Sequence, residues 1–284
     1  NNLMSENGNL YKATKDGACM SIFDDVNVDW EKKNGITENR DDLKKLISDV
    51  NSVSGSLYLN FIKSNFNYSQ FVNMLALNIY LANGSTYYHN YYLYHYPNGK
   101  WELLPWDLDK SLSYYDWMPY KYHRTSSEWE SDNPLIERAF LNTQILSDVK
   151  IRLKDVSQNL CDEKQLVPLV AKLETLIKKS VEKDTSDQIK NLAEWKKNLE
   201  KEKTFFKTRH NKLHEQFTVW PSSFLVKRLE QKVCDEILFE WTASESQRGK
   251  PITYTISISP DFLFNDSAKL IMKTTSDASF LFKK

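Results

Sequence analysis

The strongest constraint on the fold of this chain is the stretch HNYYLYHYPNGKWELLPWDLD at residues 89–109. Its first half alternates in polarity and is rich in aromatic residues, which is typical of a β-strand. The Pro-Asn-Gly-Lys segment at 97–100 has strong turn chemistry, and a second apolar run follows it. The sequence therefore predicts a β-hairpin over residues 87–106, which ends in the two acids Asp107 and Asp109.

The segments around this hairpin predict mainly helices. Residues 40–50 and 57–83 carry apolar side chains at helical spacing, with Ser69 as the expected N-cap of the second helix in the latter range. Residues 110–132 have no clear period and are expected to form a long loop. Residues 133–220 again predict helices, including a long charged one from about 187 to 217. The expected fold class is α+β, a mainly helical domain with a central β-hairpin.

The pattern changes after residue 220, where apolar residues begin to alternate with a period of two. This part resembles the start of a fibronectin type III or immunoglobulin-like sandwich, with Trp241 and Tyr254 expected to point inward. The remaining residues fall well short of the roughly 100 that a complete sandwich needs. We therefore expect two domains, at residues 1–220 and 233–284, the second being a partial β module.

Charge and hydropathy exclude several classes of function. Among 284 residues, 38 are basic and 38 are acidic, so the formal net charge is zero. This balance gives no electrostatic reason to expect binding to nucleic acid or to an anionic membrane. No apolar run approaches the roughly 20 residues that a membrane-spanning helix needs. We expect neither a nucleic-acid partner nor a transmembrane segment.

The acids after the hairpin are candidate metal ligands. Two carboxylates at positions i and i+2 of a strand lie on the same face, and Asn90 would add a carboxamide oxygen from the other strand. Oxygen ligands of this kind suit Mg²⁺ or Mn²⁺, and phosphoryl-transfer sites use such sets. Composition and spacing by themselves favour a plainer interpretation, in which Asp107 caps a turn and Asp109 is solvated.

The longer stretch LANGSTYYHNYYLYHYPNGKWELLPWDLDKSL at 81–112 resembles the signature of the CotH (spore coat protein H) kinase family. Other blocks resemble that family in the same order along roughly residues 8–217. They are GNLYK at 8–12, DWEKKNG at 29–35, DDLKKLI at 41–47, NPLIERAFLN at 133–142 and FFKTRHNKL at 205–213.

The resemblance implies an atypical kinase-like fold that binds ATP with Mg²⁺ or Mn²⁺ and phosphorylates protein serines. On the family pattern, Asn90 and Asp107 take the metal-binding positions and Asp109 is the supporting second acid. Ser85 falls where the family has its catalytic aspartate, five residues before the asparagine. The resemblance also implies a location outside the cytoplasm, secreted or on the cell surface, and a protein substrate or a cell-surface partner.

Two departures from the family pattern put catalysis in doubt. Serine cannot accept a proton near neutral pH as a carboxylate does, and general-base help is typically worth about 10²–10⁴ in rate. No segment matches the lysine with which the family clamps its nucleotide, so we expect the N-terminal lobe to be missing or incomplete. Lys12 and Lys32 are available cations without a pattern that assigns either. Phosphotransfer is therefore expected to be weak or lost, as in a pseudokinase.

Other interpretations remain open at this point. The chain would equally serve as a non-catalytic scaffold for adhesion or partner binding at a cell surface, and its aromatic content leaves carbohydrate handling as a weaker option. His89 is a substitute base in principle, although a packed, hydrogen-bonded histidine is the expected role. His210 and His214 have the spacing of a two-histidine metal site, but solvent exposure is expected for both.

Overall fold

The computed structural model describes residues 7–14, 18–34, 38–87, 89–115, 124–126, 129–185, 191–218, 226–233, 235–241, 243–244, 246, 251–260 and 271–283. The chain divides into two compact units, Asn1–His210 and Asn211–Lys284, which are described separately below. Seven α-helices and several antiparallel sheets are found in this described part, which confirms the expected α+β class. The domain boundaries expected from the sequence, and the family of the second unit, stay predictions.

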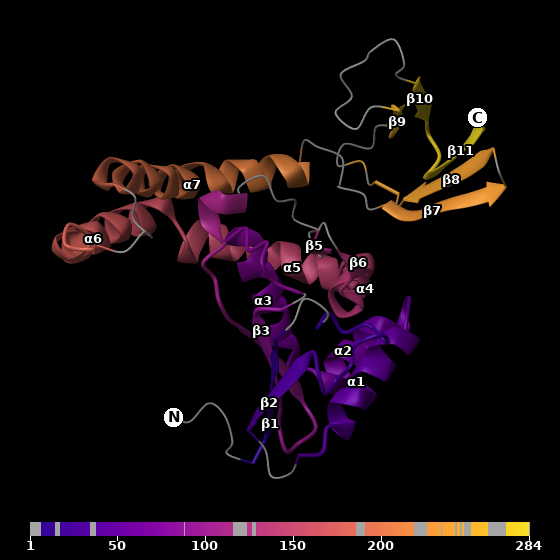
Figure 1. Cartoon of the computed structure of the whole chain (residues 1–284), viewed down its shortest axis with the longest axis horizontal. Helices are drawn as coiled ribbons and strands as arrows, with labels where there is room; N and C mark the ends of the chain where they lie inside the picture. Colours follow the sequence, from indigo (N-terminus) through magenta and orange to yellow (C-terminus); the bar gives the residue numbers. More distant parts are fainter. Residues whose placement is uncertain are drawn as a thin grey trace. The chain divides into compact units, whose positions relative to one another are not determined.

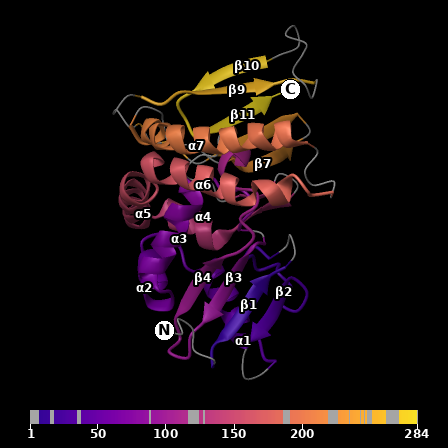
Figure 2. The same ribbon diagram turned by 90° about the vertical axis from the view of Figure 1, so that its left-hand side faces the viewer.

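A four-stranded antiparallel sheet carries the hairpin in the first unit, and Figure 2 shows its strands side by side. The strands run in the order β2-β1-β3-β4, and they are β1 (Asn9–Ala13), β2 (Trp30–Asn34), β3 (Tyr91–His95) and β4 (Trp101–Pro105). In the hairpin, Tyr91 pairs with Pro105 and His95 with Trp101, and Gly99 supplies a positive φ of 83° at the turn. The predicted hairpin is therefore confirmed.

The helices of the first unit follow the expected ranges with one correction, to the N-cap of α3. They are α1 (Asp41–Ser52), α2 (Leu57–Asn65), α3 (Tyr68–Tyr80), α4 (Pro134–Leu141), α5 (Thr143–Asp155), α6 (Glu163–Val181) and the long α7 (Leu192–Thr218), whose last turns belong to the second unit. The range 57–83 is interrupted because Phe66 forms a bridge with Trp101 and the Asn67 N–H donates to the Trp101 carbonyl. The N-cap of α3 is thus Asn67, and the expectation for Ser69 is wrong.

The expected loop at 110–132 contains some regular structure. A 3₁₀ turn, η1, spans Leu112–Tyr115, and two short paired strands follow, β5 (Arg124–Ser126) and β6 (Trp129–Asp132). The expectation of a loop without regular structure is wrong for these residues. Residues 116–123 and 127–128 of that range lie outside the described residues.

Helix α3 is the centre of the first unit. It is apolar on most of its surface, and eight of its thirteen residues are buried, among them Phe71, Leu75 and Ile79. A helix that is hydrophobic on nearly all sides must be enclosed by other elements. It packs against α5 (Figure 1) and against β4, so its C-terminal end and the chain that follows it are fixed inside the unit.

A half-buried carboxylate joins α1 to the sheet. Asp42 accepts hydrogen bonds from Asn9 Nδ2 at 2.8 Å, Tyr11 Oη at 2.6 Å and the Leu43 amide at 2.8 Å, and it lies 2.8 Å from His95 Nδ1. Burial of Asp42 opposes its ionisation. The hydrogen bonds from His95, Tyr11 and Asn9 outweigh that cost and hold the pKa of Asp42 well below its usual range.

The second unit is rich in strands. A three-stranded sheet has the order β11-β8-β7, and β10 pairs with β9. These strands are β7 (Val226–Val233), β8 (Glu236–Trp241), β9 (Tyr254–Ile258), β10 (Ile271–Thr275) and β11 (Ser279–Lys283). Trp241 and Tyr254 are both buried, with ring centroids 5.1 Å apart, which confirms that they point inward.

Membrane insertion of a helix is not supported by the described residues. None of their helices combines the length and the apolar character that a bilayer crossing requires.

The Asp42 junction predicts a pH-dependent contribution to stability. Asp42→Asn should lower the free energy of unfolding by about 2 kcal/mol near neutral pH, because charge-assisted hydrogen bonds are lost. Since the folded-state pKa is depressed, this contribution is present above the ordinary value of 3.8 and is lost as pH falls below it. Urea unfolding of parent and variant from pH 7 to pH 2.5 should show the difference shrinking below pH 3.8.

The matched control is Asp41→Asn, an exposed neighbour in the same helical turn, which should stay within about 0.5 kcal/mol of the parent. A difference between Asp42→Asn and the parent that stays constant down to pH 2.5 would contradict this account.

Candidate functional site

A buried arginine fixes the end of α3, where the loop with the candidate site residues begins. Arg209 of α7 is fully buried, and its Nε donates to the Tyr80 carbonyl at 2.9 Å. A second guanidinium nitrogen donates to the Ile79 carbonyl, and the group lies over the Phe205 ring. The last carbonyls of a helix lack partners within the helix, so Arg209 supplies donors that water cannot supply in this interior position.

The loop that follows is tied to buried polar side chains. The amide of Asn83 donates to the Asn78 carbonyl at 3.0 Å. Asn78 Nδ2 donates to the Tyr87 hydroxyl at 3.2 Å, and Asn133 Nδ2 donates to the Tyr87 carbonyl at 2.8 Å. Asn133 also caps α4 through its side-chain oxygen. The conformation of the loop after α3 is therefore determined by hydrogen bonds to residues of α3 and at the start of α4.

The end of the hairpin returns to this loop. The amide of Trp106 donates to the Asn90 carbonyl at 3.3 Å, and that of Leu112 donates to the Leu81 carbonyl at 2.6 Å. These two bonds align residues 106–112 with residues 81–90. We refer to the two segments together as the site loops.

Backbone strain concentrates in the site loops. Among the described residues, six that are not glycine have a positive φ, and five of these six lie in the site loops. Left-handed conformations cost about 1 kcal/mol or more for most residues and accumulate where surrounding structure enforces them. The five residues are Ala82, Tyr87, Asn90, Asp107 and Leu112.

Unsatisfied polar groups concentrate in the same segments. Asn83 Oδ1, Thr86 Oγ1 and Ser111 Oγ are buried and have no hydrogen-bond partner within the structure. The three side chains belong to residues that are 1%, 0% and 7% exposed. A buried polar atom without a partner is costly, and at a functional site such atoms indicate bound water, an ion or a ligand.

Ser85, predicted at the position of the catalytic base, is in direct contact with Asn90. Ser85 is 1% exposed, and its hydroxyl accepts a hydrogen bond from Asn90 Nδ2 at 3.0 Å. Because the amide nitrogen is used in this bond, Asn90 Oδ1 stays available as an acceptor or metal ligand. The serine therefore orients the carboxamide.

The two acids lie beyond the end of β4 on an exposed segment. Asp107 and Asp109 are both exposed, and the neighbouring Trp106 is 48% exposed. Lys12 of β1 places its Nζ 5.4 Å from the centre of the Trp106 ring. Lys32, the other cation considered from the sequence, instead donates to the Asn39 carbonyl and lies over the Tyr11 ring. The structure thus brings Lys12, and not Lys32, to the residue before Asp107.

The donor set suits a hard divalent cation in its chemistry. Asn90 Oδ1 and the two carboxylates are oxygen ligands, and Mg²⁺ typically takes few protein ligands and completes its shell with water and phosphate oxygens. Within the described residues there is no group of three or more histidine, cysteine or acidic side chains that could hold a metal by itself. The residues therefore fit an ion shared with a phosphate ligand better than a closed protein site.

The remaining sequence candidates have ordinary roles. His210 is half-buried, with its Nδ1 3.3 Å from Ser157 Oγ, so the expected solvent exposure is wrong for this histidine, whereas His214 is exposed. Trp101 is buried in the sheet, as expected for a core aromatic residue. His89 is half-buried beside Asn90. The sequence alone did not identify Arg209, although an arginine four residues after Phe205, and so on the same face of a helix, is a detectable signal.

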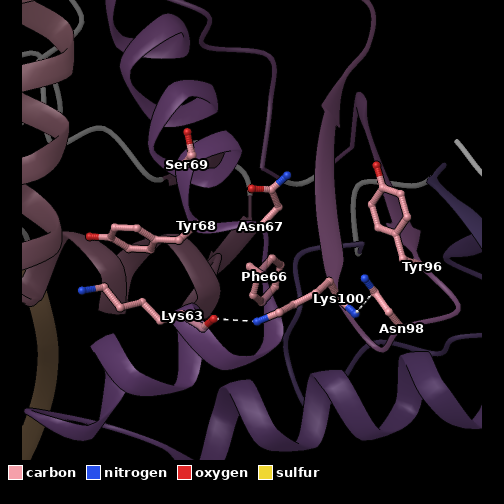
Figure 3. A pocket seen from close by; sticks show the side chains of 8 residues that line it. All are labelled: Lys63, Phe66, Asn67, Tyr68, Ser69, Tyr96, Asn98 and Lys100. Atoms are coloured by element: carbon pink, nitrogen blue, oxygen red, sulfur yellow. Dashed lines mark hydrogen bonds between the residues drawn. The ribbon is translucent and has the colours of Figure 1, made fainter. Parts of the chain in front are cut away.

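A separate hollow of about 690 Å³ lies at the opposite end of the hairpin, around its turn (Figure 3). Lys100 crosses its floor and donates to the Lys63 and Ser64 carbonyls at the end of α2. The hollow is lined by Lys63, Phe66, Asn67, Tyr68, Ser69, Tyr96, Asn98 and Lys100. The hollow contains none of the candidate site residues.

Comparison with known proteins gives one result for this chain. A family model described as CotH kinase protein matches residues 1–213, which is most of the chain and includes both site loops. Among curated proteins, none matches the chain significantly.

The role of Arg209 predicts a large loss of stability on its removal. Arg209→Met keeps much of the side-chain volume but leaves the Ile79 and Tyr80 carbonyls without these donors, and should cost about 3 kcal/mol in urea unfolding. Hydrogen exchange should also show faster exchange at the Asn83 amide, since the loop is no longer anchored. Lys207→Met, on an exposed position of the same helix, is the matched control. A cost below 1 kcal/mol would refute the anchoring role.

Proposed function

This chain belongs to the CotH kinase family, and we propose on that basis that its site loops bind ATP together with Mg²⁺ or Mn²⁺. Phosphotransfer to protein serine is proposed to be weak or lost. The observation that carries the proposal is the coincidence of strained backbone and unsatisfied buried polar atoms in the site loops. These are two independent signs of a ligand site, and both fall on the segments that match the family signature.

In this proposal three side chains hold the ion. Asn90 contributes Oδ1, which the bond to Ser85 leaves available, and Asp107 and Asp109 contribute carboxylate oxygens. The bound ion would neutralise phosphate charge and fix the orientation of the phosphate chain. Lys12 would add a second positive charge from β1, since it already lies against Trp106.

The environment of Ser85 supports binding without efficient catalysis. Its hydroxyl is buried and fixed to Asn90, and it carries no charge with which to take a proton from a substrate hydroxyl. The same observation favours a second function, a non-catalytic kinase-like scaffold that binds a protein partner at a cell surface. A location outside the cytoplasm, secreted or surface-bound, belongs to both proposals.

Nucleotide binding is tested by thermal unfolding. With Mg²⁺-ATP at about 100 times its Kd, the parent should gain about 2.7 kcal/mol and its Tm should rise by roughly 5 °C or more. Asp107→Ala should abolish the rise, whereas Asp277→Asn, an exposed acid in the second unit, should retain it. No shift in the parent, or an equal shift in Asp107→Ala, would remove the nucleotide site.

The missing base is tested by restoring it. Ser85→Asp should raise transfer of radiolabelled γ-phosphate to a serine-rich protein by about 10²-fold, because a carboxylate can accept the hydroxyl proton. Ser85→Asn, of similar size but without a base, should leave transfer at the low parental level. A fast parental rate would show that Ser85 does not occupy the base position.

A further inference from the structure

Helix α6 differs from the other helices of the first unit because it buries none of its residues. It is nineteen residues long and amphipathic, so an enclosed apolar face would be expected. Three leucines at a spacing of four and then three residues instead stay in solvent. We call them the leucine stripe: Leu169, Leu173 and Leu176, which are 48%, 47% and 74% exposed.

One side of α6 is occupied by α7. The two helices run alongside each other (Figures 1 and 2), and Lys203 Nζ of α7 lies 3.1 Å from Glu174 Oε2 of α6. Val170, which is half-buried, is about 40° from Glu174 around the helix and so lies on this side. At 100° per residue, the centre of the leucine stripe is turned away from Glu174, so α7 does not cover it.

A row of lysines accompanies the stripe on its other edge. Lys172, Lys179 and Lys183 are exposed and repeat at intervals of seven and four residues, so they run parallel to the leucines. Within the described residues none of the three lies in an ion pair. We call these lysines the basic ridge. The two acids of α6 do not compensate it, since Glu163 lies in the first turn, far from the ridge lysines along the helix, and Glu174 pairs with Lys203. Glu182, the C-cap residue, lies 3.9 Å from Lys178.

We propose that the leucine stripe and the basic ridge bind an amphipathic helix of another protein whose apolar seam is flanked by acidic residues. The stripe provides the spacing that such a helix matches, and the ridge provides charge complementarity along one edge. An exposed apolar stripe bordered by charge on a soluble protein is typical of an interaction surface. This proposal is independent of the nucleotide site.

A second copy of the chain fits this surface less well. An antiparallel two-fold dimer through α6 would place the basic ridge of one copy against the same ridge of the other, because an isologous contact joins a patch to itself. Like charges along the whole edge oppose that pairing. In a parallel dimer, the basic ridge of one copy would face the opposite edge of the leucine stripe in the other copy. That edge is already occupied by α7.

The experiment uses the full chain and a synthetic probe. The probe is a fluorescein-labelled helical peptide of three heptads with leucine at the a and d positions and glutamate at the flanking e and g positions. Fluorescence anisotropy should show saturable binding that weakens as salt rises from 50 mM to 500 mM, because the ridge contributes exposed charges. A peptide with lysine at the flanking positions should bind about tenfold more weakly.

Variants of the chain then test each part of the surface. Changing Lys172, Lys179 and Lys183 together to glutamate should reverse the preference, so that the lysine-flanked peptide binds the better. Leu173→Ser with Leu176→Ser should reduce binding of both peptides by at least about tenfold, as expected for central apolar contacts. Leu57→Ser, a 66% exposed leucine on α2, is the matched control and should bind as the parent does. Circular dichroism establishes that each variant is folded.

Three results would overturn the proposal. The first is no saturable binding of the glutamate-flanked peptide to the parent chain. The second is equal binding of both peptides, which would leave the basic ridge without a role. The third is a dimer in sedimentation equilibrium that the leucine substitutions dissociate, which would make a second copy the occupant.

Discussion

The site in the first unit depends on the contact between the Arg209 guanidinium and the last carbonyls of α3. A buried guanidinium needs acceptors, and the end of a buried helix needs donors, so each group compensates the desolvation of the other. The contact joins α7 to α3 across more than a hundred residues of sequence. Because α3 is enclosed on most sides, the point where the chain leaves it is fixed. The loop that begins there therefore starts from a fixed position.

Some polar residues around the loop anchor it from the interior, and others are exposed to solvent. Asn78 and Asn133 hold Tyr87 from inside, and Ser85 holds the carboxamide of Asn90, while the acids after β4 stay in solvent. In the proposed function, Ser85 orients a metal ligand from the position where the family has a catalytic acid, so binding is separated from chemistry. The interior of the unit would then keep Asn90 in position, and only the proton acceptor would differ. A nucleotide-binding scaffold is the outcome that this proposal expects.

The sequence predicted those features that local chemistry determines. The hairpin follows from its turn residues and its alternating aromatic residues, and the helical ranges follow from the spacing of their apolar residues. The N-cap of α3 was misassigned to Ser69 because the break between α2 and α3 depends on pairing with Trp101, which is distant in sequence. The resemblance to a family assigned Asn90 and Asp107, and the structure adds the residues that support them.

Two other features could not be predicted from the sequence, because they too depend on contacts between distant segments. The choice between Lys12 and Lys32 required the register of β1 against β3, which places Lys12 opposite Tyr92 and near Trp106. The buried state of Arg209 required the packing of α7 on α3. Periodicity in one segment carries no information about such pairings, since they arise only when elements far apart in the chain meet.

The strand order has a consequence for how the molecule assembles. Strand β1 lies between β2, its neighbour in sequence, and β3, which follows only after α1, α2 and α3. The β3–β4 ribbon closes a short loop and forms early, whereas joining β1 to β3 requires a large loss of chain entropy. Completion of the sheet is therefore a late folding event that waits for the intervening helices to collapse. Until then β3 presents an unpaired edge, and the newly made chain is most prone to aggregate during this interval.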